Sequence, residues 1–231
     1  MPDRLHQKQP PQPPQAQQPP QTQAARSSLR SDAQDNRERI LVAARALFAA
    51  DGLNVSMREV ARRAEVGPAT LYRRFPTKQT LIDEAFAKER RTCLAIVDEG
   101  CADPDPWRGL CLVIEKVCEV NAHNHGFTEA FMSVFPCSPE FAATRAYALN
   151  AIAQLARRAK ESGRLRPDFV LDDLLLVLVA NRGMRALPEV DQVAASRRFA
   201  ALMIQSFQAP DEKHPPLPPA PRLSAALLKN P

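Results

Sequence analysis

Apolar side chains recur along this chain at three- and four-residue intervals, which is the spacing of helices rather than the alternation of strands. Over residues 35–50, Ile40, Ala44 and Phe48 lie on one helical face, and Gly52 follows as a C-terminal cap. The whole chain holds only seven glycines, which also favours helices. The pattern predicts an all-α protein.

Capping residues and prolines mark where the other helices begin and end. Ser56 and Thr77 are each predicted to cap a helix. Between them Pro68 begins a two-turn helix, because proline at the first helical position removes an amide that has no intrahelical partner. Pro76 ends that helix, since the residue before a proline is pushed away from helical angles. The predicted helices span 35–50, 57–64, 68–75, 78–99, 107–123, 127–135, 139–162, 169–186 and 189–207.

Both ends of the chain have the composition of disordered segments. Residues 1–25 hold seven prolines and eight glutamines, and residues 209–231 hold seven more prolines. Such segments bury too little apolar surface to offset the entropy of ordering. We therefore expect a disordered Pro/Gln-rich tail over 1–31 and a disordered Pro-rich tail over 209–231, with docking of Leu223, Leu227 and Leu228 as the alternative for the second.

The second and third helices form a helix-turn-helix, a motif whose second helix enters the DNA major groove. The sequence VGPATLYRRFPTK begins at Val66 and places a tyrosine and two arginines on the third helix. Leu71 and Phe75, four residues apart, are predicted to face the core. The polar side chains between and around them then face outward, where hydroxyl, phenol and guanidinium groups are suited to phosphate oxygens.

Positive charge is concentrated around these helices. Residues 37–90 hold eleven Lys or Arg against seven Asp or Glu, whereas the whole chain has a formal net charge of +5. A basic surface permits an anionic partner such as DNA.

Two stretches, VSMREVA over 55–61 and TLYRRFPTK over 70–78, resemble the DNA-binding signature of TetR/AcrR-type transcriptional regulators. The resemblance covers about 37–85. It implies a three-helix DNA-binding domain over 32–80, followed by a larger helical domain over 81–208 for effector binding and dimerisation. It also implies a homodimer, a double-stranded palindromic operator and a small hydrophobic effector.

The resemblance also implies the roles of individual side chains. The residues expected to contact phosphates are Ser56, Thr70, Tyr72, Arg74 and Lys78. The residues expected nearest the bases are Arg58, Gly67, Pro68, Ala69 and Arg73. Glu65 departs from the family pattern, because many members carry glycine at this point of the turn. Arg62 and Arg63 are interpreted as solvent-facing or ion-paired.

Late helices of this family pair with their copies into a four-helix bundle, and we expect the dimer interface there. The apolar faces in question are Leu171, Leu174, Leu175, Leu178 and Val179 on one helix, and Phe199, Leu202, Met203 and Phe207 on the next. An ordinary internal core is the alternative for both.

The effector pocket is expected between the fourth helix and the 107–185 region, with mostly apolar lining. The candidate lining residues are Trp107, Cys111, Cys118, Phe127, Phe131, Phe135, Tyr147, Asn181 and Arg182. Plain core packing is the alternative for each. For Arg182 the two interpretations are an anionic effector and an internal acid such as Asp172 or Asp173.

Metal binding and oxidant sensing are weaker alternatives. Glu119 and His123 are four residues apart on a helix, near Cys118 and His125, but no second cluster matches them, so no metal or cofactor is predicted. Cys111 and Cys118 face the same way but are about 10 Å apart along the helix, too far for a disulfide.

The sequence therefore predicts a DNA-binding repressor that a small molecule releases from its operator. An effector-independent regulator or activator that recruits proteins through its tails is the alternative. An enzyme is not predicted, because GxSxG, HExxH and phosphate-binding glycine loops are missing. With no apolar run of eighteen residues and no apolar segment of signal-peptide length at the start, we expect a cytoplasmic protein that is nucleoid-associated when bound to DNA.

Overall fold

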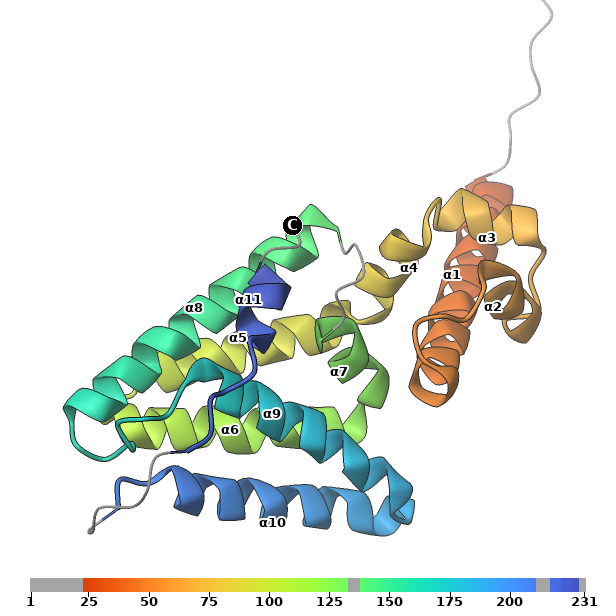
Figure 1. Cartoon of the computed structure of the whole chain (residues 1–231). Coiled ribbons are helices and arrows are strands. Elements are labelled where there is room, and N and C mark those ends of the chain that lie inside the picture. The colour runs from red at the N-terminus through yellow and green to blue at the C-terminus, as the bar shows by residue number, and fades with distance from the viewer. Residues whose placement is uncertain (1–22, 133–137, 211–216, 229–231) are drawn as a thin grey trace, which may run out of the picture. The chain divides into compact units, whose positions relative to one another are not determined.

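The computed structural model describes residues 23–132, 138–210 and 217–228 (Figure 1). Within these residues the regular elements are helices, apart from one isolated bridge between Leu165 and Gln208. The predicted all-α class is confirmed.

Three helices form the N-terminal part: α1 (Gln23–Asp51), α2 (Met57–Arg63) and α3 (Pro68–Arg74). Helix α1 begins inside the tail that the sequence predicts as disordered, and residues 1–22 lie outside the described residues. The helix crosses the boundary between two compact units of the chain, which divide after Asp35. From Ile40 onward its apolar face is buried as the sequence pattern predicts.

Local capping defines the short helices. Ser56 Oγ accepts a hydrogen bond from Glu59 N at 3.2 Å, and Pro68 occupies the first turn of α3. Because two turns of helix are unstable alone in water, α3 depends on its buried side chains. Leu71 and Phe75 are both fully buried in the N-terminal core.

The fourth predicted helix is broken in two, as α4 (Lys78–Ala85) and α5 (Ala87–Ala102). Phe86 interrupts it with φ −109° and ψ 15°, although neither glycine nor proline stands there. The Phe86 ring is fully buried, with ring centroids 6.0 Å from both Phe48 and Phe127. The prediction of one continuous helix over 78–99 is wrong at this residue, where burial of an aromatic ring accompanies the break.

The larger part is built from α6 (Pro106–His123), α7 (His125–Met132), α8 (Pro139–Glu161), α9 (Leu171–Asn181), the 3₁₀ turn η1 (Arg182–Ala186) and α10 (Glu189–Phe207). Helix α6 packs against α5, α8, α9 and α10 (Figure 1). The apolar faces of these helices form the main core.

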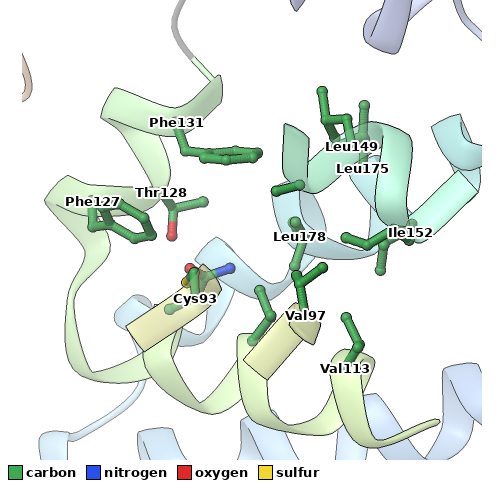
Figure 2. Close-up of a pocket in the computed structure, with 14 residues that line it drawn as sticks. Cys93, Val97, Val113, Phe127, Thr128, Phe131, Leu149, Ile152, Leu175 and Leu178 are labelled. Atoms are coloured by element: carbon green, nitrogen blue, oxygen red, sulfur yellow. The ribbon is translucent and has the colours of Figure 1, made fainter. Parts of the chain in front are cut away.

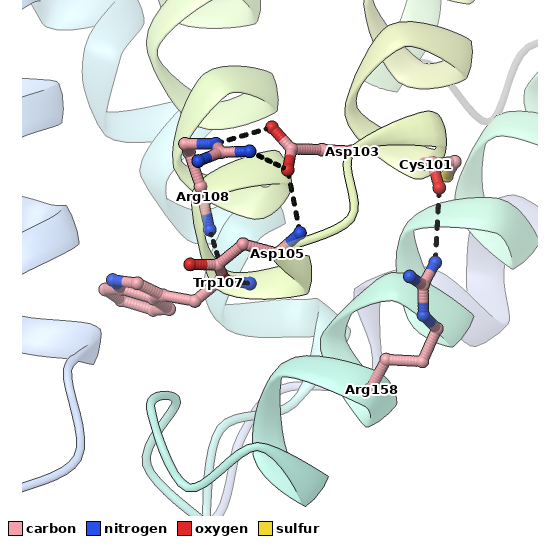
Figure 3. Close-up of polar contacts among 6 residues, drawn as sticks. All are labelled: Cys101, Asp103, Asp105, Trp107, Arg108 and Arg158. Carbon is pink, nitrogen blue, oxygen red and sulfur yellow. Dashed lines mark hydrogen bonds and ion pairs between the residues drawn. The ribbon is translucent and has the colours of Figure 1, made fainter.

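The turn between α5 and α6 is fixed by carboxylates (Figure 3). Asp105 Oδ1 accepts from the backbone amides of Trp107 and Arg108 at 2.9 and 3.2 Å and so caps α6. Asp103 binds the Arg108 guanidinium in a two-pronged pair at 2.7 and 2.8 Å. On the neighbouring helix, Arg158 donates to the Cys101 carbonyl at 3.2 Å.

Part of the C-terminal tail that the sequence predicts as disordered has a defined structure. Residues 217–228 are described, and helix α11 (Leu223–Leu228) packs on α8 and α9. Leu227 is only 3% exposed and belongs to the main core. For residues 217–228 the structure agrees with the alternative prediction, in which leucines of the tail dock on the body of the protein.

None of the helices within the described ranges is both long and apolar enough to cross a membrane.

Helices α5 and α6 approach closely at Gly100 and Gly109. A Cβ on Gly100 would lie 2.7 Å from the Gly109 carbonyl oxygen, and a Cβ on Gly109 would collide with the Gly100 carbonyl. Side chains larger than hydrogen do not fit between these two backbones.

We predict that Gly109→Ala destabilises the protein by roughly 1–3 kcal/mol or more, the range for overpacking a tight contact. Gly183→Ala is the matched control, because its added Cβ would meet nothing within 4 Å. Urea unfolding followed by circular dichroism measures both. Equal urea midpoints for Gly109→Ala and Gly183→Ala would contradict the close approach of α5 and α6 at Gly109.

Candidate nucleic-acid interface and internal cavity

The turn between α2 and α3 has a helix-ending geometry that favours glycine. Glu65 N donates to Arg62 O at 3.2 Å and Val66 N to Ala61 O at 3.0 Å, the paired bonds of a Schellman motif. Its left-handed position is occupied by Glu65, with φ 54°. Glu65, which departs from the family pattern, therefore adopts a left-handed conformation that is unfavourable for residues with a side chain.

The ten predicted DNA contacts all reach the surface in part or in full. Thr70 and Lys78 are half-buried, and Tyr72 is 48% exposed. The exposed remainder are Ser56, Arg58, Gly67, Pro68, Ala69, Arg73 and Arg74. With Leu71 and Phe75 buried beneath, α3 presents a polar, basic outer side.

The arginines of α2 and α3 differ in their partners. Arg62 donates to both carboxylate oxygens of Glu59, at 2.6 and 2.9 Å, and this hydrogen bond holds the pKa of Glu59 below its usual value. Arg73 reaches Thr70 Oγ1 at 3.3 Å. Within the described part of the chain, no carboxylate pairs with Arg58, Arg73 or Arg74. Three guanidinium groups therefore remain available, and the ion-paired interpretation holds for Arg62.

Lys78 begins α4 beside this surface. Partial burial lowers the pKa of its ammonium group.

An internal cavity of about 40 Å³ lies among α5, α6, α7, α8 and α9 (Figure 2). Its lining is apolar except for Cys93, Asn121 and Thr128. The Thr128 hydroxyl is buried and has no hydrogen-bond partner among the residues that the structure describes. The other lining residues are Val97, Val113, Val117, Phe127, Phe131, Ala148, Leu149, Ile152, Leu174, Leu175 and Leu178.

Of the nine predicted ligand residues, Phe127 and Phe131 line this cavity. Trp107 and Cys118 are buried in the main core away from it, and Cys111 is half-buried. Tyr147 is 54% exposed and donates to Asp98 at 2.8 Å. Phe135 lies outside the described residues.

The polar pair at the end of α9 has internal partners. Asn181 Nδ2 donates to the Cys118 carbonyl at 3.0 Å. Arg182 lies 3.3 Å from Glu129, rather than pairing with Asp172 or Asp173 as considered from the sequence. Most of the cavity lining, including Thr128, was not predicted from the sequence. Thr128 could have been, because its hydroxyl lies between Phe127 and Phe131 on a short apolar helix.

Glu129 joins the larger part to the DNA-binding part. Its Oε1 accepts from the backbone amide of Leu53 at 3.0 Å, directly after α1, while Oε2 faces Arg182. On the same helix α7, Phe127 contributes both to the cavity lining and to the N-terminal core. Helix α7 is thus a physical connection between the cavity and the helix-turn-helix.

Cys93, Cys111 and Cys118 are poor candidates for oxidant sensing. Burial raises the pKa of Cys93 and Cys118 to about 12 and that of Cys111 to about 11. Thiolates are the reactive form, and few are present at neutral pH with such values. Within the described ranges no three metal-ligating side chains gather into a cluster.

A basic helix-turn-helix joined to a helical part with an internal cavity defines a class of DNA-binding regulators. The family model described as bacterial regulatory proteins, tetR family, matches residues 40–85. The repressor KstR of Mycolicibacterium smegmatis is 37% identical over 112 residues, which cover 47% of this chain and 55% of KstR. The chain therefore spans about half the length of this relative.

Other relatives match over a longer range. The regulator UidR of Escherichia coli K12 is 26% identical over 187 residues, covering 75% of this chain and 91% of UidR. A tetR-family regulatory protein from Rhodococcus RHA1 has the same fold, with a TM-score of 0.59 and 19% identity over 76% of this chain and 98% of its own. The match over residues 40–85 and these relatives support a transcriptional regulator of the TetR type.

We predict that Glu65→Gly stabilises the protein by about 1 kcal/mol, because glycine adopts positive φ without the penalty of a side chain. Glu65→Ala is the matched control, since it removes the same charge and keeps the strain. Unfolding midpoints in urea measure the difference between them. Equal stability of the glycine and alanine variants would refute a strained turn.

Proposed function

We propose that the chain is a transcriptional repressor that binds a palindromic operator as a homodimer and is released by a small apolar effector. The observation that carries the proposal is α3, which exposes arginines without acidic partners above the buried anchors Leu71 and Phe75. The match of residues 40–85 to the tetR family supports DNA as the partner. That KstR is named a repressor favours repression over activation.

Within this proposal the contacts divide into two groups. Ser56, Thr70, Tyr72, Arg74 and Lys78 hold phosphates, and these contacts position the protein without reading sequence. Arg58 and Arg73 carry guanidinium groups that can bind guanine in a two-pronged manner. The remaining base-proximal residues, Gly67, Pro68 and Ala69, are small and exposed, so they permit close approach and contact with thymine methyl groups.

The homodimer is proposed to form through the exposed apolar residues of α9 and α10. Leu174, Leu175 and Leu178 from the expected face are buried in the main core, so the internal-core alternative applies to them. Leu176 and Val179 are 42% and 43% exposed, and Leu202 is 48% exposed. Two reading helices in a dimer suit half-sites about one DNA turn (34–36 Å) or more apart.

The effector is proposed to be a largely apolar molecule without a formal charge at its buried end. The lining residues carry no charged group, while Thr128 and Asn121 offer neutral hydrogen-bonding groups. A cavity of about 40 Å³ is far below the roughly 300–1,000 Å³ of drug-sized pockets. The effector must therefore bind a widened state, and DNA affinity falls if that widening displaces α7 and the contacts of Glu129.

Substitutions in the proposed interface should separate positioning from reading. Lys78→Ala is expected to weaken binding to all sequences alike and to reduce the salt slope by about one unit per protomer. Arg58→Ala is expected to relax preference at particular base pairs, by about 1–3 kcal/mol of discrimination. Fluorescence anisotropy with a set of single-base operator variants at several salt concentrations measures both effects.

Arg62→Ala is the control on the same helix as Arg58, because its guanidinium already pairs with Glu59. It should leave base preference unchanged. A uniform loss of affinity in Arg58→Ala, with discrimination intact, would remove Arg58 from base reading.

A further inference from the structure

The C-terminal residues 217–228 return to the body of the protein and end in α11 beside α8 and α9 (Figure 1). Within this segment Leu227 is 3% exposed and joins the main core, whereas Leu217 is 48% exposed. Leu223 packs partly against the same core. One leucine thus anchors the segment while another at its start remains in solvent.

Two side chains, Asp172 and Arg145, hold helix α11 by hydrogen bonds near its beginning and its end. Asp172 at the start of α9 accepts from the amide and the hydroxyl of Ser224, both at 2.8 Å. Arg145 of α8 is 1% exposed and donates to the Leu227 carbonyl at 2.8 Å. The same guanidinium donates to the Phe131 carbonyl on α7 at 3.2 Å. The segment is therefore tied to α9 through Asp172, and to α8 and α7 through Arg145.

The helices that α11 joins are also walls of the cavity. Ala148, Leu149 and Ile152 line it from α8, and Leu174, Leu175 and Leu178 line it from α9. Phe131, which shares Arg145 with Leu227, lines it from α7. Widening the cavity by parting α8 from α9 requires that α11 lose its hold on at least one of them.

The segment depends on its contacts with the body of the protein for its structure. A helix of six residues has no stability of its own in water, so α11 is held by its contacts with α8 and α9. Pro218, Pro219 and Pro221 precede it and provide no backbone donors. Segments with few buried contacts open before the helices that carry the core.

We propose that residues 217–228 are a releasable latch, which holds α8 and α9 together, keeps the cavity small and leaves when an apolar ligand enters. The role of this release in effector binding rests on the proposed function, whereas the attachment and release of residues 217–228 do not. Loss of the Leu227 anchor then raises the affinity of the cavity for apolar molecules.

The test uses the full chain and the neutral dye Nile red as the probe. Leu227→Asp is expected to bind the dye about tenfold more tightly than the unchanged protein, a gain of about 1.4 kcal/mol. Leu217→Asp is the matched control, because it places the same charge on an exposed leucine of the same segment, and it should bind as the unchanged protein does. Equal dye affinity in all three proteins, with far-ultraviolet circular dichroism unaltered, would overturn the latch.

A second substitution locates the dye. Ala148→Leu in the Leu227→Asp protein fills the cavity from α8 and should abolish the added binding. If the added binding persists, the dye occupies the surface that α11 has left, and the cavity is not what the latch controls.

Hydrogen exchange on the unchanged protein keeps the proposal testable if Leu227→Asp does not fold. Amides of α11 are expected to exchange at least about a hundredfold faster than those of α9. Exchange as slow as that of α9 would make the segment a permanent part of the fold. Neither experiment uses DNA, so failure of the proposed repression would leave these results unaffected, and the reverse also holds.

Discussion

A row of four phenylalanines links the N-terminal core to the cavity. Phe48 of α1, Phe86 between α4 and α5, and Phe127 and Phe131 of α7 follow one another with ring centroids 6.0, 6.0 and 6.2 Å apart. These separations are those of favourable aromatic pairs. Because interiors are close-packed, a shift of one ring is passed to the next rather than absorbed. The row gives the N-terminal core and the cavity wall a common packed element.

Helix α7 takes part in both the N-terminal core and the cavity. Its Phe127 serves both the N-terminal core and the cavity, and its Glu129 binds the amide after α1. Gly52 stands at that point with φ 77°, and a Cβ there would lie 2.6 Å from Glu129 Oε1. The end of α1 is thereby held by a left-handed glycine and a carboxylate from a distant helix. The proposed latch reaches the same helix, because Arg145 of α8 donates to the carbonyls of Phe131 on α7 and Leu227 on α11.

Much of the fold could be predicted from the sequence, because local chemistry defines it. Proline at Pro68, the caps at Ser56 and Thr77, and the four-residue spacing of Leu71 and Phe75 act within one or two turns. The break at Phe86 could not be predicted, since it accompanies the burial of one ring between two others far away in sequence.

The candidate cavity was less predictable for the same physical reason. The rotation of α6 and α8 about their axes, which is set by packing against neighbouring helices, decides which of their side chains line the cavity. Tyr147 is therefore exposed, while its neighbour Ala148 lines the cavity. The pairing of Arg182 with Glu129 depends equally on tertiary contact. The docking of residues 217–228 could not be predicted, because the proline content of this stretch suggests disorder. Its partners Asp172 and Arg145 lie 52 and 82 positions earlier in the sequence than Ser224 and Leu227.

The most direct test of the account is selection of bound DNA from a random duplex pool by the purified full chain in moderate salt. The account predicts enrichment of a palindrome whose half-site centres are about one DNA turn or more apart. Recovery of unenriched DNA, or of a lone half-site without its inverted copy, would contradict a homodimer that reads sequence through α3.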